Sequence, residues 1–334
     1  GDNAQGKTNI LESIYFCSIG KSQRTNKDKE LIKWECDTAF IKVFVCKDSL
    51  DKKIEVKIFK EGKKGININS IKVRKIAELM GVFQVVMFSP EDLKIVKESP
   101  SYRRKFLNVE LCKLNKKYYY SLVQYNKVLN ERNIILRNWR NERSDLLDIY
   151  DSQLSKYGAV IIKTRERYIH KLNTFGKQIH KDISNDTENI EFEYITCVDD
   201  YGNIEKQLLE VYGLSRKIDI DKRITSKGPQ RDDFSIFING VDTRIYGSQG
   251  QQRTAVLTIK FASLHLIKEL TGEYPVLLLD DVLSELDTKR QKYILNSIKD
   301  MQTIITCTGI GDIKSYLKCD SQIFLVKDGI IKQL

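Results

Sequence analysis

The sequence is poor in proline and histidine, and its cysteines follow no ordered pattern. Its 334 residues include 4 prolines and 3 histidines, and His170, His180 and His265 lie too far apart to suggest a metal cluster. The 7 cysteines are odd in number, scattered, and form no C-x-x-C pair. Neither a disulfide framework nor a zinc site is therefore expected, and the cysteines are interpreted as reduced core residues of a cytosolic protein.

Long apolar runs are also missing. No segment approaches the roughly 18 consecutive apolar residues that a membrane span requires, and no signal sequence is visible. The chain is nevertheless 41% hydrophobic, which is enough for a sizeable core. Its length predicts two domains, or one domain with a large insertion. The cysteine pattern and the lack of a long apolar run predict a cytoplasmic protein without membrane contact.

Acidic residues are outnumbered by basic ones. Lys and Arg total 56 against 45 Asp and Glu, which gives a net charge of +11 and a pI near 9.1. This excess favours a polyanionic partner such as nucleic acid, although surplus lysine also simply increases solubility.

The first eight residues match the Walker A pattern G-x4-G-K-[ST]. Such a loop wraps phosphates with backbone N–H groups, while Lys7 reaches the β/γ oxygens and the Thr8 hydroxyl ligates Mg²⁺. Apolar residues at helical spacing follow, so the loop is expected at a helix N-terminus, which favours anions. Because the pattern needs a preceding strand, the chain is interpreted as a fragment that lacks it. The candidate nucleotide-binding residues here are Gly1, Asp2, Asn3, Ala4, Gln5, Gly6, Lys7 and Thr8.

The central part of the chain changes texture near residue 100. Residues 39–46, 53–60 and 66–69 predict an antiparallel meander, and 83–88 predict a buried strand. From Ser101 to Ser184 proline is absent and apolar residues recur at helical spacing, which predicts a helical hairpin interrupted near 141–145. Strands are predicted at 190–195 and 234–238, the latter turning at Asn239-Gly240.

Charged residues within the helical region permit two interpretations. Basic clusters at 103–105, at 116–117 and around Arg165 and Arg167 either contact phosphates or form an ordinary solvated helix face. His170 and His180 fall in the same charged stretch and are predicted to be solvated.

A second half of a nucleotide site lies near the end of the chain. Residues 275–281 form a continuous apolar strand that ends in Asp280 and Asp281, which is the Walker B pattern. Asp280 would hold Mg²⁺, and Asp281 would polarise the attacking water. Upstream, the polar turn at 247–253 leads into a helix; it is either a second anion-binding N-terminus or simply a serine N-cap. Residues 303–308 predict a further buried strand.

In this order, the motifs resemble those of ATP-binding-cassette ATPases, and in detail those of the RecF family of bacterial recombination and repair proteins. The resemblance rests on five segments: 20–25 (GKSQRT), 29–34 (KELIKW), 88–93 (FSPEDL), 228–233 (GPQRDD) and 247–254 (GSQGQQRT). It implies an α/β fold: a P-loop ABC-type ATPase head with an antiparallel β-subdomain and an inserted helical arm. Residues 1–98 and 215–334 are assigned to the head, and 99–214 to the arm.

The resemblance also implies an activity. Two subunits would sandwich two ATP molecules with Mg²⁺, each Walker A loop facing the Ser248 turn of the partner, and the dimer would clamp double-stranded DNA near single-strand gaps. Recombination-mediator proteins would be partners in loading a recombinase. DNA-stimulated hydrolysis would be slow, since Asp281 stands where most cassette ATPases have Glu. The implied nucleotide contacts are Arg24, Ser248, Gly250 and Gln251.

Two alternatives remain at this point. An ATPase subunit of a transporter shares the motifs, but it would have a shorter helical lobe and no need for a net charge of +11. A DNA-binding structural protein with a vestigial nucleotide site is the other alternative, and the intact Lys7, Thr8, Asp280 and Asp281 argue against it.

Overall fold

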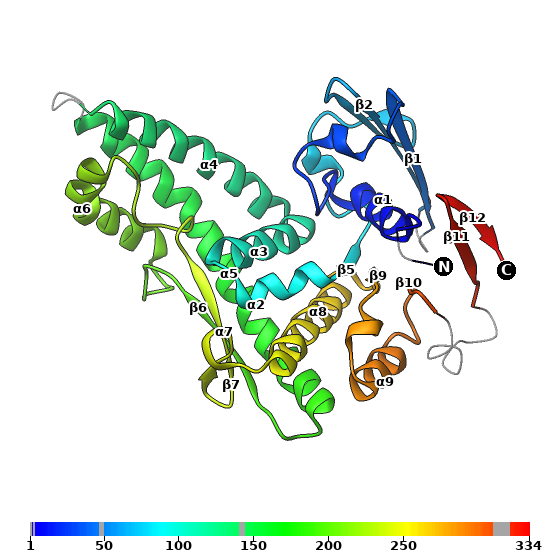
Figure 1. Cartoon of the computed structure of the whole chain (residues 1–334). Helices are drawn as coiled ribbons and strands as arrows, with labels where there is room; N and C mark the ends of the chain where they lie inside the picture. Colours follow the sequence, from blue (N-terminus) through cyan, green and yellow to red (C-terminus); the bar gives the residue numbers. More distant parts are fainter. Residues whose placement is uncertain (1, 3, 47–49, 140–143, 310–320) are drawn as a thin grey trace. The chain divides into compact units, whose positions relative to one another are not determined.

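The computed structural model describes residues 2, 4–46, 50–139, 144–309 and 321–334. The chain divides into two compact units (Figure 1): Gly1–Asp92 with Ser263–Leu334, and Leu93–Ala262. The domain boundaries expected at 98/99 and 214/215 differ from this division, and the assignment of head and arm stays a prediction. Within the described ranges, no helix is both long and apolar enough to cross a lipid bilayer.

A parallel sheet forms the centre of the first unit. Its strands β5 (Val85–Phe88), β9 (Val276–Asp280) and β10 (Thr303–Thr306) have the order β10-β9-β5. All of β5 is buried, as the continuous apolar run predicts for a strand covered on both faces. Helices α1 (Lys7–Ile19) and α9 (Thr288–Ser297) belong to the same unit. The register pairs Thr306 with Asp280, so the carboxyl ends of β9 and β10 lie side by side.

The first unit also contains the predicted antiparallel meander. Strands β1 (Thr38–Val45), β2 (Lys52–Phe59), β3 (Lys64–Ile68) and β4 (Ile71–Lys72) pair in sequence order (Figure 1). Alternation along β2 buries Ile54, Val56 and Ile58 completely, which confirms the expected sheet with one covered face. A hairpin of β11 (Phe324–Lys327) and β12 (Ile330–Gln333) was not predicted.

Short 3-10 helices lie in the connections of the first unit, and one of them, η3, crosses its boundary at Asp92. Their bounds are η1 (Asp28–Leu31), η2 (Ile76–Glu78), η3 (Pro90–Leu93) and η5 (Leu283–Glu285). The helix predicted around residues 76–80 is therefore a single 3-10 turn.

Long helices dominate the second unit. They are α2 (Lys94–Lys97), α3 (Pro100–Leu114), α4 (Lys116–Arg137), α5 (Ser144–Ser184) and α6 (Ile204–Lys222). Helix α5 has 41 residues and packs against α4, α6 and β6, which confirms the helical hairpin. The interruption expected at 141–145 lies largely outside the described residues, but α4 ends at Arg137 and α5 begins at Ser144. Helix α6 had no counterpart in the predictions.

A small antiparallel sheet completes the second unit. Strands β6 (Ile190–Ile195), β7 (Asp233–Ile238) and β8 (Val241–Asp242) pair in this order, and helices α7 (Thr243–Tyr246) and α8 (Gln249–Thr271) follow. Asn239 and Gly240 both have positive φ, 51° and 78°, as a two-residue hairpin turn requires. The predicted hairpin is therefore confirmed, and it delivers the chain to the start of α8.

Three surface predictions were wrong. Arg103, Arg165 and His180 are 3%, 2% and 0% exposed. Arg103 forms a bidentate pair with Asp233 over 2.6 and 2.8 Å, so it serves the core and not a phosphate. These side chains are buried because α3 and α5 are covered on more than one face, which a charge count along a single helix does not reveal. The interpretation of all cysteines as core residues fails for the exposed Cys36 and Cys46, and Cys319 lies outside the described residues.

Candidate nucleotide-binding site

The Walker A loop ends in a conformation that suits glycine. Gly6 has φ 101° and is the N-cap of α1, and Ala4 also has a positive φ of 61°. The first turn of α1 contains no acidic side chain, so its N–H groups and its dipole remain suited to an anion. Gly1 and Asn3 lie outside the described residues, and Asp2 is exposed.

Lys7 folds back over this loop. Its Nζ donates to the backbone carbonyls of Asp2 and Cys307, each over 3.1 Å. Cys307 directly follows β10, so the ammonium lies at the carboxyl edge of the parallel sheet. Ligands bind at this edge in open α/β sheets. The two carbonyls are neutral, and a phosphate would be a stronger acceptor for the same ammonium.

One carboxylate oxygen of Asp280 accepts hydrogen bonds from two threonine side chains. The hydroxyls of Thr8 and Thr306 each donate to Asp280 Oδ1 over 2.9 Å, and Asp280 is 6% exposed. The predicted metal ligands Thr8 and Asp280 are thus brought together from opposite ends of the chain. Thr306, which lies in the predicted buried strand at 303–308, thereby helps to fix the Asp280 side chain.

The spacing of this oxygen pair fits magnesium. Mg²⁺ holds its ligands at right angles and at about 2.1 Å, which places neighbouring oxygens about 3 Å apart. Thr8 Oγ1 and Asp280 Oδ1 are 2.9 Å apart. Among the described residues no group of three or more His, Cys, Asp and Glu side chains could hold a metal ion. A magnesium ion bound here would therefore take its remaining ligands from water and from nucleotide phosphates.

Asp281, the predicted catalytic carboxylate, has a strained backbone. Its φ is 52°, which is uncommon for a residue other than glycine and is found at functional sites. Its N–H donates to Thr306 Oγ1 over 3.1 Å, and its carboxylate accepts from Ser284 Oγ over 3.0 Å. These contacts fix the acid just beyond the end of β9.

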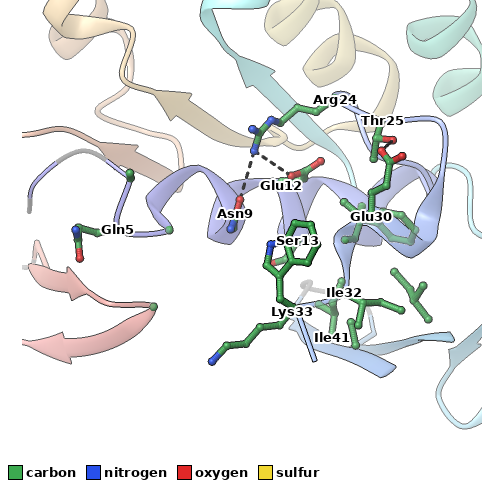
Figure 2. Close-up of a pocket in the computed structure, with 18 of the residues that line it drawn as sticks. Gln5, Asn9, Glu12, Ser13, Arg24, Thr25, Glu30, Ile32, Lys33 and Ile41 are labelled. Atoms are coloured by element: carbon green, nitrogen blue, oxygen red, sulfur yellow. Dashed lines mark hydrogen bonds and ion pairs between the residues drawn. The ribbon is translucent and has the colours of Figure 1, made fainter. Parts of the chain in front are cut away.

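A cleft of about 920 Å³ lies beside the loop, bordered by α1, β1 and the β11–β12 turn (Figure 2). Arg24 reaches across α1 and contacts Asn9 over 3.3 Å and Glu12 over 3.6 Å. Ser22 fixes the backbone at Arg24, because its hydroxyl donates to Glu12 Oε1 and accepts from the N–H groups of Arg24 and Thr25. Arg24 thus lines a cleft whose size suits a nucleotide, next to the phosphate-binding loop.

The cleft has a wall that the sequence analysis missed. The N–H of Asp328 donates to Gln5 Oε1 over 2.7 Å, and the N–H of Gly329 donates to the Gln5 carbonyl over 3.2 Å. The β11–β12 turn therefore holds the Walker A loop by its glutamine. An Asp-Gly pair between apolar residues is a hairpin signal that could have revealed the turn, although not its contact with Gln5.

The predicted Ser248 turn belongs to the second unit. Ser248 Oγ accepts from the N–H of Gln251 over 3.2 Å, and Gln251 Oε1 accepts from the N–H of Ser248 over 2.9 Å. This reciprocal pair is a capping box that starts α8. Gly247 is required there, since a Cβ would lie 2.4 Å from the Thr243 carbonyl. Ser248 itself is exposed, and Gly250 and Gln251 are half-buried.

Known proteins resemble the chain over its whole length. Residues 1–331 match the family described as RecF/RecN/SMC N terminal domain. The DNA replication and repair protein RecF of Clostridium kluyveri is 65% identical over 335 residues, covering 100% of this chain and 92% of the relative. RecF of Clostridium novyi is 66% identical over 333 residues with the same coverage.

Solved structures of known proteins also resemble this chain. A structure of the recombination mediator protein RecF with ATP, from the RecFOR pathway, matches with a TM-score of 0.90 and 40% identity, covering 99% of this chain and 89% of that one. The Smc head domain of Pyrococcus furiosus, bound to the C-terminal domain of ScpA, matches with a TM-score of 0.55 at 14% identity, covering 100% of this chain and 88% of that one. The second likeness supports the fold alone. The predicted ABC-type ATPase head fold is confirmed.

Proposed function

The chain belongs to the RecF family, and from this premise we propose that it is an ATP-dependent DNA-binding protein of recombination and repair. The observation that carries the proposal is the convergence of Lys7, Thr8 and Asp280 at the carboxyl edge of the parallel sheet. The Thr8 hydroxyl contacts Asp280 across 272 residues of sequence, and the Lys7 ammonium contacts the carbonyl of Cys307, which directly follows the strand paired with β9. The RecF structure solved with ATP supports the same ligand.

The candidate site residues of the first unit each have a role in the proposed function. The loop at residues 1–6 and the N-terminus of α1 cradle the phosphates, and Lys7 exchanges its carbonyl partners for phosphate oxygens. Thr8 and Asp280 hold Mg²⁺, which neutralises phosphate charge when bound. Arg24 contacts the nucleotide from the cleft wall.

The Ser248 turn supplies the other half of the site in trans. We propose that ATP joins two copies of the chain, so that the turn at Ser248, Gly250 and Gln251 faces the Walker A loop of the partner subunit. The support is that one chain has two phosphate-type helix starts, of which the second begins with an exposed serine. An anion seated on Ser248 would benefit from the N-terminus of α8, a helix of 23 residues.

Asp281 is proposed to orient and polarise the water that attacks the γ-phosphate. Its carboxylate is one methylene shorter than the glutamate usual in cassette ATPases, so slow hydrolysis is expected. Slow turnover suits a switch in which ATP closes the dimer and hydrolysis reopens it. DNA is proposed to stimulate the reaction by favouring the closed state.

Duplex DNA near single-strand gaps is the proposed partner of the closed dimer. The net charge of +11 supports a polyanion, and relatives carry names of DNA replication and repair proteins. Recombination-mediator proteins are further proposed partners, since the related RecF structure is of the RecFOR pathway. A cytoplasmic location, where bacterial DNA and ATP occur together, completes the proposal.

One experiment tests the sandwich. Ser248→Arg places a long cation at the start of α8, and the control Ser99→Arg changes another exposed serine at a helix N-cap of the same unit. Sedimentation velocity with ATP, ADP or no nucleotide, with and without gapped duplex DNA, measures dimerisation; a fluorescent ATP analogue measures binding to the monomer.

The wild type and Ser99→Arg are expected to dimerise with ATP and not with ADP, and more readily on DNA. Ser248→Arg is expected to bind ATP normally and to stay monomeric. Loss of ATP affinity by the Ser248→Arg monomer would place Ser248 in its own subunit's site and contradict the arrangement in trans.

A further inference from the structure

The start of α8 is tied to the end of α5 through two side chains outside the predicted nucleotide site. Gln251 Nε2 donates to Glu188 Oε1 over 2.9 Å, and the other oxygen of Glu188 lies 3.3 Å from His180 Nε2. His180 is 0% exposed, and the Glu188 side chain is 21% exposed. The largely buried Glu188 carboxylate thus links the buried His180 imidazole to Gln251 of the capping box.

The same imidazole reaches α8 at a second point. His180 Nδ1 lies 2.9 Å from Thr258 Oγ1, and Thr258 is fully buried. Thr258 follows Gln251 by seven residues, which is about two turns and about 10.5 Å along the helix axis. Contacts at two levels of one helix face restrain both the position of α8 and its rotation about its axis.

Chemistry assigns one of the two ring protons. A carboxylate oxygen only accepts hydrogen bonds, so the contact between Glu188 and His180 is favourable only when Nε2 carries a proton. Nδ1 faces the Thr258 hydroxyl, whose single proton goes either to Nδ1 or to the Thr254 carbonyl, 2.9 Å away. In either state Glu188 keeps one oxygen for His180 and the other for Gln251.

The Gln251 side chain is thereby fixed at both of its polar atoms. Its Nε2 is held by Glu188, and its Oε1 accepts from the N–H of Ser248 over 2.9 Å. Rotation of this amide would break both contacts, and it would place its NH₂ group against the N–H of Ser248. The orientation of the capping box therefore depends on Glu188.

We infer that Glu188 and His180 are positioning residues of the composite ATP site: they hold Gln251, and through it Ser248, in the orientation that a nucleotide in the partner subunit requires. This inference rests on the proposed function, because the ATP sandwich is what gives the Ser248 turn its ligand. Neither residue touches the nucleotide.

Three variants test the inference. Glu188→Ala removes both contacts, whereas Glu188→Gln keeps an amide oxygen that can accept from Gln251. Glu191→Ala is the matched control, because Glu191 is an exposed glutamate three residues further along the chain. Amide hydrogen exchange, resolved to the peptide that contains residues 247–252, reports the turn directly. ATP-dependent dimerisation and ATP binding by the monomer are measured on the same preparations.

In Glu188→Ala, the rate of amide exchange at the turn is expected to rise about tenfold, because a hydrogen bond to a charged group is lost. ATP-dependent dimerisation is expected to weaken by a similar factor, with ATP binding by the monomer unchanged. Glu188→Gln is expected to recover most of both effects, and Glu191→Ala to behave as the wild type.

Each contrary result has a separate meaning. Unchanged exchange at residues 247–252 overturns the positioning role, whatever happens to dimerisation. Exchange that rises throughout the second unit identifies a merely structural role and also overturns it. Local exchange that rises without any change in dimerisation removes the residues from the composite site. If the wild type itself forms no dimer with ATP, the proposed function fails, while the local exchange still decides whether Glu188 holds the turn.

Discussion

Thr306→Val is the sharpest test of how Asp280, the proposed magnesium ligand, is held. The Thr306 hydroxyl donates to Asp280 Oδ1 over 2.9 Å and accepts from the Asp281 N–H over 3.1 Å, and the residue is 9% exposed. Valine keeps the branched shape, so little of the effect comes from a change in packing volume. The substitution thus removes a hydroxyl that contacts both acids at the end of β9.

The expected cost follows from these two contacts. A hydrogen bond to a charged group contributes about 1.5 to 3 kcal/mol, and the Asp281 N–H left without an acceptor costs about 1 kcal/mol more. The added methyl group returns up to about 0.8 kcal/mol through burial. The free energy of unfolding of the first unit is therefore expected to fall by about 2 to 3 kcal/mol.

Thr303→Val is the matched control in the same strand. Its hydroxyl donates to the neutral Met301 carbonyl over 3.2 Å, so a loss below about 1 kcal/mol is expected. Urea unfolding gives the free energies, and hydrogen exchange of peptides from β9 and β10 reports the first unit separately. The affinity for Mg²⁺-ATP should fall in Thr306→Val alone. If Thr306→Val costs no more than the control, the hydroxyl does not hold Asp280.

The other predictions concern hydrolysis, the core, a helix cap and DNA. Asp281→Asn is expected to trap the ATP-bound dimer in single-turnover assays, and unchanged hydrolysis would remove Asp281 from its role. Arg132→Met should destabilise the second unit by about 3 to 5 kcal/mol in urea unfolding, because it leaves the carboxylates of Asp151 and Asp219 buried beside an apolar side chain; a loss below 1 kcal/mol would contradict this. Asp287→Ala should cost about 1 kcal/mol as the lost N-cap of α9. Burial raises the pKa of Asp287, but the N–H and the charge of Arg290 outweigh burial, so the folded pKa lies below the ordinary value. The cap therefore stabilises the fold above the unfolded pKa of about 3.9, and this stabilisation is lost as the pH falls through the lower folded pKa. Curves of unfolding free energy against pH that are parallel in wild type and variant would refute this. Log affinity for DNA should fall by about 0.9 per phosphate neutralised for each unit of log salt, and a flat response would exclude an electrostatic grip.

Local chemistry made much of the fold predictable. The turn at Asn239-Gly240 follows from the need for two positive φ angles, and β5 and β9 follow from short apolar runs that only a covered strand accommodates. The Walker A loop and the Walker B acids are equally local, because each depends on fixed spacings within a few residues.

Burial along the long helices was not predictable in the same way. Arg165 was predicted either to contact phosphate or to belong to a solvated helix face. It instead donates to the Pro229 carbonyl, Tyr118 and Asn108 inside the second unit. A helix that packs against several elements has no single polar face, so the periodicity of α5 does not reveal which charged side chains are covered.

The candidate site also combines features that are local in sequence with features that depend on the fold. Motif spacing alone identifies Lys7, Thr8, Asp280 and Asp281 as candidates for binding phosphate and magnesium. How they are held follows from the fold: Thr306 reaches Asp280 through the pairing of β9 with β10, the N–H of Asp328 binds Gln5, and Glu188 binds Gln251. The physical reason is that a motif is fixed by covalent neighbours, whereas a supporting partner is any residue that the fold brings within 3 Å or so, at no fixed distance along the chain.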